Sequence, residues 1–406
     1  MTAALLCACT APTPSEPPRV EALVLASVDP ETGAPRLELA EVELSRVDDL
    51  DTLSGDWFQT TRAGGLRAQI VGATLVNSTF EGGDPPSPRY RLDDRGVATP
   101  RDYDTLAMFS TLDALETVFE ALDETTGLDP DVILAPYGPI DVIYEPRLEV
   151  ERDGMIQHQI GTTNAYFDSS GPRFAVLRRS AFEGEPLAID RRVLAHETGH
   201  FVFFLSFFSG ADDGCDPDAV ESNLADPFFA GRFEWEYALA GINEGFADLV
   251  AFAITGTVDV LAGVFPAAEG QSITTQRTIR LPVACDDGAF YCIGTTFARS
   301  AYDAFLATGG DPLSAPSRRA FVRSIVDALR DLPATMRERG LVPAATGVVA
   351  ECMVEPGLTD VGTQVLSAFL DALLSRLDEP TRTALCPALI DHFGERFLVA
   401  ARTECS

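Results

Sequence analysis

The chain has 406 residues, 46% of them hydrophobic, which is enough to bury large cores in more than one domain. Its formal net charge is −32, which argues against a nucleic-acid-binding protein because an acidic surface repels phosphate. Beyond the first residues no apolar run is long enough to cross a membrane, so no transmembrane span is expected.

Residues 1–20 have the pattern of an export leader followed by a tether. A short apolar stretch ends in Leu6-Cys7-Ala8-Cys9, and a Pro-rich polar segment follows. This is similar to the end of a bacterial lipoprotein signal, and it would place a lipid anchor on Cys9, although the usual basic opening is missing. We therefore expect an exported bacterial protein, either a cell-surface lipoprotein or a secreted one. The alternative is cytoplasmic residence.

Residues 21–99 are predicted to be β-rich. The segments Ala22–Val28 and Gln69–Val76 have the composition of strands, and Arg36–Leu44 alternates with period two. Residues 82–88 are rich in Gly and Pro, which is typical of a loop. We interpret this region as a small accessory or pro-like module. Alternatively, its strands are simply the first strands of the sheet in the domain that follows.

Residues 100–190 are predicted to form a helix and a sheet. Tyr103–Leu122 carries one apolar stripe at helical spacing. Strands are predicted to follow at Val132–Leu134, Ile140–Tyr144 and Asn164–Phe167. These elements would be the upper part of a domain that spans residues 100–406.

The remainder of that domain, residues 191–406, is predicted to be mainly helical. Arg318–Leu332 and Val361–Leu377 are amphipathic, and Gly309-Gly310 marks the end of a helix rather than a phosphate-binding loop. The whole pattern predicts an α+β protein with a β-rich N-terminal region, a mixed sheet and a mainly helical lower half.

The segment Val193–Val202 carries the strongest chemical signal. It contains two of the four histidines of the chain, His196 and His200, with Glu197 between them. Residues four apart on a helix lie on one face, so both imidazoles can hold one metal ion while Glu197 reaches a metal-bound water. This is the HExxH arrangement of zinc metalloproteases. The alternative is a buried helix whose histidines are satisfied by hydrogen bonds in the core.

A second apolar-flanked segment, Ala240–Val250, can complete such a site. Glu244 can supply a third metal ligand. Asp248 lies four residues later on the same face and can accept the other ring N–H of a zinc-bound histidine, which fixes the orientation of the ring. The alternative is a pair of solvated helix carboxylates. The apolar neighbours argue against it, because buried carboxylates need partners.

Together, HETGH and the downstream NEGFAD resemble the gluzincins, the thermolysin-like zinc peptidases whose third ligand is a glutamate in an NExxxD-type motif. The resemblance covers residues 100–310 and implies a thermolysin-like catalytic domain. It implies further that Asn164 and Ala165 lie on an edge strand that binds the backbone of a peptide substrate. The segment Gly294–Phe305 resembles the helix that follows the glutamate ligand in that family.

The sequence departs from the gluzincin pattern in two places. The spacing from His200 to Glu244 is longer than usual and includes the acidic segment 210–218, which we interpret as an inserted loop near the cleft. The histidine that often stabilises the oxyanion is replaced by Tyr291, whose hydroxyl could donate the same hydrogen bond. Alternatively Tyr291 is a half-buried aromatic. His392 is a remote candidate for that role, but a lone histidine of this kind, like His158, is more often structural.

The cysteines are consistent with export. Of the 8 cysteines, Cys7 and Cys9 belong to the leader, and the even number that remains can pair fully into disulfides. Cys285 and Cys292 are close enough in sequence to close one short loop. The alternative is free buried thiols. The remaining cysteines are Cys215, Cys285, Cys292, Cys352, Cys386 and Cys405.

The function expected from the sequence is zinc-dependent hydrolysis of peptide bonds in a peptide or protein substrate. The expected zinc ligands are His196, His200 and Glu244, and Glu197 is the expected general base. Two alternatives remain open: a zinc-binding surface lipoprotein that has lost catalysis, and a zinc hydrolase with a non-peptide substrate.

Overall fold

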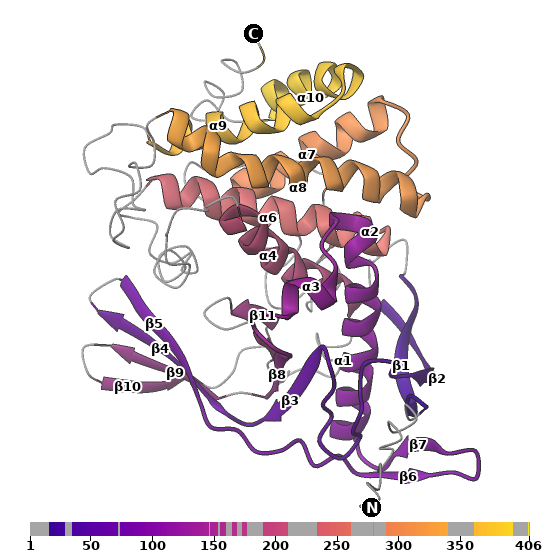
Figure 1. The fold of residues 1–406 in the computed structure, drawn as a ribbon. Helices are drawn as coiled ribbons and strands as arrows, with labels where there is room; N and C mark the ends of the chain where they lie inside the picture. The colour runs from indigo at the N-terminus through magenta and orange to yellow at the C-terminus, as the bar shows by residue number, and fades with distance from the viewer. Residues whose placement is uncertain are drawn as a thin grey trace, which may run out of the picture.

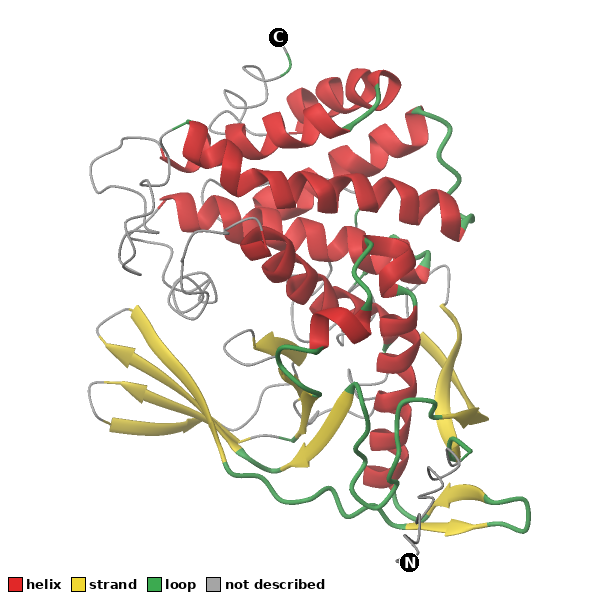
Figure 2. Cartoon of the chain, viewed as in Figure 1, coloured by secondary structure: helices red, strands yellow, loops and turns green. Residues whose placement is uncertain are grey.

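A computed structural model describes the residues 16–28, 35–71, 74–145, 147–152, 155–159, 165–168, 173–176, 190–209, 234–260, 279, 290–339, 361–392 and 405. Helices gather at one end of the molecule and strands at the other, with the chain running from the strand end to the helical end (Figures 1 and 2). This confirms a mixed α and β fold with a β-rich N-terminal region.

The first sheet is built from the start of the chain. It contains β1 (Arg19–Val28), β2 (Pro35–Glu43), β6 (Tyr90–Leu92) and β7 (Val97–Pro100), in the order β2-β1-β7-β6. β1 is antiparallel to β2 and parallel to β7. The predicted strands at Ala22–Val28 and Arg36–Leu44 are therefore confirmed as hydrogen-bonded partners.

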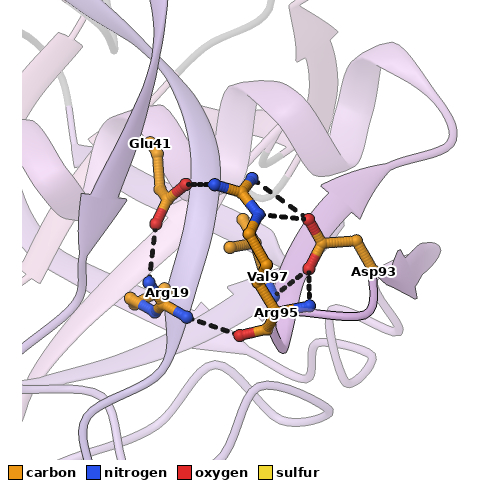
Figure 3. Close-up of polar contacts among 5 residues, drawn as sticks. All are labelled: Arg19, Glu41, Asp93, Arg95 and Val97. Carbon is orange, nitrogen blue, oxygen red and sulfur yellow. Dashed lines mark hydrogen bonds and ion pairs between the residues drawn. The ribbon is translucent and has the colours of Figure 1, made fainter.

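A polar network closes the turn between β6 and β7 and ties it to β1 and β2 (Figure 3). The carboxylate of Asp93 accepts hydrogen bonds from the backbone N–H groups of Arg95 and Val97, both at 2.8 Å. Glu41 lies between two guanidinium groups, 2.9 Å from Arg19 and 3.1 Å from Arg95. All four charged side chains are at least one quarter exposed, so the network lies at the surface.

Helix α1 (Tyr103–Glu120) packs along the first sheet, as Figure 1 shows. Asp102 caps its N-terminus by accepting from the backbone N–H of Thr105 at 2.9 Å. Ser110 accepts from the backbone N–H of Leu23 in β1 at 2.8 Å. The predicted apolar stripe is buried at Phe109, Leu112, Leu115, Val118, Phe119 and Leu122.

A second sheet lies nearest to the helices that follow. Its strands are β3 (Phe58–Arg62), β8 (Ile140–Tyr144), β11 (Ala165–Asp168) and β12 (Arg173–Val176), in the order β11-β12-β8-β3. β8 pairs in parallel with both β3 and β12, and β11 is antiparallel to β12. The predicted strand at 140–144 is confirmed, and β11 lies at one edge of the sheet.

A third sheet has the order β10-β9-β4-β5, with β4 (Gly65–Val71), β5 (Thr74–Glu81), β9 (Arg147–Arg152) and β10 (Met155–Gln159). The prediction of one strand over 69–76 is wrong, because β4 and β5 are antiparallel partners with Val71 opposite Thr74. β4 is parallel to β9, and β3 is parallel to β8. Both the second and the third sheet therefore combine strands from residues 58–81 with strands from residues 140–176.

The prediction of a strand at Val132–Leu134 is also wrong, because these residues belong to the short helix α3 (Pro130–Leu134). Asp129 caps this helix through the N–H of Asp131, and Pro130 occupies a first-turn position where its missing N–H has no consequence. The indole of Trp57 also donates to Asp131 at 2.6 Å, which fastens α3 to the β-rich region.

The helical end of the molecule consists of long helices packed on one another. Arg318–Leu332 lies within one of them and 361–376 forms another, as predicted. None of the helices within the described ranges is long and apolar enough to span a bilayer. The helices, after the short α2 (Leu122–Thr126), are α4 (Arg191–Ser209), α6 (Glu234–Thr255), α7 (Phe290–Ala307), α8 (Ala315–Glu338), α9 (Val361–Arg376) and α10 (Glu379–His392).

One disulfide joins the described cysteines. Cys386 in α10 is bonded to Cys405 near the end of the chain. Cys215, Cys285 and Cys352 lie outside the described residues, and the side chain of Cys292 is not described either, so the pairing of these four remains a prediction. Cys9, the predicted site of a lipid anchor, also lies outside the described residues. The Cys386–Cys405 bond confirms that at least part of the cysteine set is oxidised.

Candidate metal centre

The candidate site lies where α4 packs against α6. On α4, His196 and His200 are one turn apart and their rings meet edge to face, with centroids 4.7 Å apart. Residues on either side of this pair are apolar and buried: Val193, Leu194, Ala195, Phe201 and Val202. These buried apolar residues anchor α4 in the core. The two imidazoles face α6, where Glu244 lies.

Glycine residues let the helices around the site approach closely. A Cβ atom on Gly199 would lie 2.6 Å from the Cα of Ala247, so α4 and α6 meet almost backbone to backbone. A Cβ atom on Gly245 would lie 2.3 Å from the carbonyl oxygen of Gly294, so α6 and α7 are equally close. Larger residues would separate the three helices and the side chains that they carry.

Glu244 brings its carboxylate between the two histidines. Its Oε2 lies 3.5 Å from Nε2 of His196, and its Oε1 lies 3.9 Å from Nε2 of His200. The ligand atoms of the three residues all lie within 4.8 Å of one another. Tetrahedral zinc ligands are about 3.3–3.6 Å apart, as follows from zinc–ligand bonds of about 2.0–2.2 Å. The three side chains are therefore close to the spacing that one metal ion requires.

Each histidine has an acceptor for its second ring nitrogen. Nδ1 of His196 lies 3.0 Å from Oδ1 of Asp248, although the angle departs from that of an ideal hydrogen bond. Nδ1 of His200 lies 2.9 Å from Oδ1 of Asn243. Nε2 of each ring is thereby left facing the Glu244 carboxylate, where a metal ion could be held. The structure thus places Asp248 beside His196, and its role as the acceptor for a metal-bound histidine remains a prediction. The contact of Asn243 was not predicted, although the residue directly precedes Glu244.

The other predicted site residues are described to different extents. Glu197 follows His196 on α4 and is 8% exposed. Ala165 begins the edge strand β11, which packs beside α4, whereas Asn164 lies outside the described residues. Tyr291 is the second residue of α7, one turn before the Gly294 that touches α6. The side chain of Tyr291 lies outside the described part of the structure.

No known protein family matches this sequence. No curated protein is detectably similar to it either. The candidate metal site therefore rests on the geometry of His196, His200 and Glu244. That geometry is compatible with a metal site of the HExxH type.

His392 lies in a different cluster. Its Nε2 is 2.9 Å from Oδ2 of Asp303 in α7, and the same oxygen accepts from Nε of Arg299 at 2.8 Å. These contacts tie the end of α10 to α7. The side chain of His158, in β10, lies outside the described part of the structure.

Proposed function

We propose that this protein is a zinc-dependent metallopeptidase of the gluzincin type that cleaves peptide or protein substrates. The observation that carries the proposal is the gathering of His196, His200 and Glu244 across α4 and α6, with ligand atoms within 4.8 Å of one another. Three protein ligands of the His₂Glu kind are the donor set of catalytic zinc sites, in which a fourth position is kept for water.

The donor set favours zinc over calcium or magnesium. Imidazole nitrogen is a poor ligand for the hard cations, which prefer oxygen donors, and suits zinc and neighbouring transition metals. When bound, zinc would lower the pKa of a coordinated water to about 7 and polarise the scissile carbonyl. His196, His200 and Glu244 would hold the ion, while Asp248 and Asn243 would keep the two rings in position.

Glu197 is the proposed general base. Its carboxylate lies on α4 directly after a metal ligand and is mostly shielded from bulk water. In the proposed reaction this carboxylate accepts a proton from the attacking water and delivers it to the nitrogen of the leaving amine. Tyr291 is proposed to donate a hydrogen bond to the developing oxyanion, since it lies at the start of the helix that touches α6.

The edge strand β11 supports a peptide as substrate. Among the described strands β11 pairs with β12 alone and it lies beside α4, so we propose that its other edge adds an extended peptide as a further strand. Ala165 is the first residue of that strand, and Asn164 precedes it. We propose that these two residues align the peptide backbone along the free edge of β11.

Export is part of the proposal. The Cys386–Cys405 disulfide is of a kind that persists in oxidising compartments outside the cytoplasm. A lipid anchor on Cys9, or secretion without one, would place the peptidase at the cell surface or beyond it.

The function is tested by incubating the zinc-loaded protein with a mixed peptide library, beside the Glu197→Gln variant and a chelator control. The substitution retains the shape of the side chain and removes the base. We expect it to lower turnover by about 10²- to 10⁴-fold while zinc content stays the same. Zinc analysis of each sample keeps loss of metal separate from loss of the base.

Unchanged turnover in Glu197→Gln would contradict the assignment of the base. A zinc-replete wild type that cleaves no peptide would favour one of the two alternatives. Hydrolysis of non-peptide ester or amide substrates would then indicate a different zinc hydrolase, and inertness toward both would indicate a non-catalytic binding protein.

A further inference from the structure

Three residues of α4 form one line of contacts along α6. Arg192, His196 and His200 are spaced four residues apart, so they occupy one face of the helix. The guanidinium of Arg192 donates to the backbone carbonyl of Asp259, just beyond the end of α6, at 3.1 Å. His196 and His200 meet α6 itself, as described above. The two histidines therefore lie on the same face of α4 as Arg192.

Arg192 is fully buried, with a side-chain exposure of 0%. Its Nε and Nη2 atoms lie 3.0 Å and 2.6 Å from the two carboxylate oxygens of Asp190. Asp190 also accepts from the backbone N–H of Arg192 at 2.9 Å, in the manner of a helix cap. Asp190, itself 4% exposed, thus holds the guanidinium so that Nη1 is directed at Asp259.

A buried ion pair of this kind is seldom the most stabilising solution. An apolar side chain of similar volume often gives equal or greater stability, because neither charge then leaves water. An apolar contact, however, tolerates sliding of one helix along another, whereas a hydrogen bond to a particular carbonyl does not. The Asp190–Arg192–Asp259 contact therefore defines the axial position of α4 relative to the end of α6.

That axial position matters at the metal centre. A slip of one residue along a helix is a displacement of about 1.5 Å. Metal–ligand distances tolerate only about 0.2 Å. His196 lies one turn from Arg192, and its partners Glu244 and Asp248 belong to the helix that Asp259 follows. A small slip of α4 would thus move both imidazoles away from the Glu244 carboxylate.

We infer that Arg192, oriented by Asp190, is a positioning residue of the metal centre, which sets the register of α4 against α6 and so the distance between the histidine ligands and Glu244. The inference rests on the metal centre of the proposed function and does not depend on which bond the protein cleaves. Arg192 acts through the two helices and touches neither metal nor substrate.

The chain provides a matched control. Arg318 in α8 is also buried, at 6% exposure, and it also bonds a backbone carbonyl near the C-terminal end of α6, with its Nε 3.3 Å from the oxygen of Ala253. Arg318 holds α6 from α8 rather than from α4. Replacing either arginine by methionine removes a buried guanidinium that bonds a backbone carbonyl near the end of α6, but only Arg192→Met alters the helix that carries the histidines.

The test compares the full-length wild type, Arg192→Met and Arg318→Met. Zinc affinity is measured by competition with a chelator. Coordination geometry is measured by the visible absorption of the Co²⁺-loaded proteins. We expect Arg192→Met to bind zinc about 10- to 100-fold more weakly, the range seen when outer partners of metal ligands are removed. Its Co²⁺ spectrum is expected to change. Arg318→Met is expected to keep the wild-type affinity and spectrum, even where its thermal stability falls.

The inference is overturned if Arg192→Met keeps both the affinity and the Co²⁺ spectrum of the wild type, or if Arg318→Met changes them to the same extent. Arg192→Lys covers the case in which Arg192→Met does not fold. Lysine keeps the charge but lacks the planar fork that engages Asp190 and Asp259 together. We expect its zinc affinity to lie below that of the wild type, and wild-type affinity with a wild-type spectrum would overturn the inference.

Failure of the proposed function gives a different result. A wild type that binds zinc but cleaves no peptide contradicts the proposed peptidase and leaves the role of Arg192 intact. A wild type that binds neither zinc nor Co²⁺ contradicts the metal centre, and the inference is then overturned with it.

Discussion

The carboxylates of Glu116 in α1 and Asp93 in the β6–β7 turn each accept hydrogen bonds from two backbone N–H groups. Glu116 is buried, whereas Asp93 lies at the surface. Glu116 accepts from the N–H of Ser45 at 2.8 Å and of Arg46 at 3.0 Å, and it is 3% exposed. Asp93 accepts from Arg95 and Val97 at the surface (Figure 3). Burial raises the pKa of Glu116 to about 7, whereas the hydrogen bond from Val97 lowers the pKa of Asp93.

The comparison shows that burial decides the outcome when the hydrogen bonds are alike. Two N–H donors stabilise a carboxylate that stays in water, but they do not offset the loss of hydration of one that is enclosed. The contacts between α4 and α6 are buried in the same way as Glu116, since the side chains of His196 and Asp248 are nearly inaccessible to solvent. Changes to enclosed groups should therefore have large effects, and changes at the β6–β7 turn small ones.

The largest effect is expected at Glu244, the carboxylate that joins α6 to both histidines. Glu244→Ala removes one of three metal ligands and leaves a site with two imidazoles. We expect zinc affinity to fall by more than the roughly 100-fold loss that follows removal of an outer partner. Chelator competition measures the change, and zinc occupancy equal to that of the wild type would remove Glu244 from the ligand set.

A smaller effect, visible in its pH dependence, is expected at Glu116. A pKa raised from 4.5 to about 7 in the folded protein means that the folded state holds this proton more tightly than the unfolded chain. The stabilisation is complete below pH 4.5 and is lost as the pH rises through 7. Relative to Glu116→Gln, the free energy of unfolding of the wild type should fall by up to about 3 kcal/mol over that range. Urea unfolding at several pH values measures it, and parallel profiles would speak against the raised pKa.

The smallest effect, of opposite sign in pH, is expected at Asp93. Because the pKa of this carboxylate is lowered from 3.8, its contribution is present above pH 3.8 and is lost as the pH falls further. Asp93→Asn keeps an acceptor for the turn but loses the ion pair with Arg95. We expect a slight loss of thermal stability at pH 7 that shrinks as the pH falls below 3.8, smaller than the effect of Glu116→Gln. A larger loss of thermal stability at pH 7 would contradict this prediction. It would show that the surface network around Asp93 stabilises the fold more than its exposure suggests.

The sequence was sufficient to predict the candidate metal cluster of His196, His200 and Glu244 because both halves of it are local patterns. HExxH places two imidazoles on one helical face, and Glu244 and Asp248 follow the same spacing on α6. The contacts that bring the α4 residues and the α6 residues together are not encoded by a local pattern. The close approach at Gly199 and Gly245 and the contact of Asn243 with His200 depend on how three helices pack, and no spacing within one segment encodes that.

The two wrong strand predictions have distinct causes. Val132-Ile133-Leu134 is a short apolar run, and periodicity cannot separate a strand from a helix at that length. The preceding Asp129-Pro130 pair, a cap followed by a first-turn proline, was the better signal. Gln69–Val76 is uniformly β-like on both sides of the reversal between β4 and β5, so composition alone did not reveal two strands in place of one.

The sheet pairings also limit how this protein could be activated. β3 forms one side of β8, and β4 forms one side of β9. A maturation cut that released residues 21–99, as in a zymogen, would remove β3 from one sheet and both β4 and β5 from another, and would leave unpaired strand edges that are prone to aggregation. Removal of the β1–β2 hairpin alone would likewise expose an edge, because β1 pairs with β7, so neither cut leaves the sheets intact.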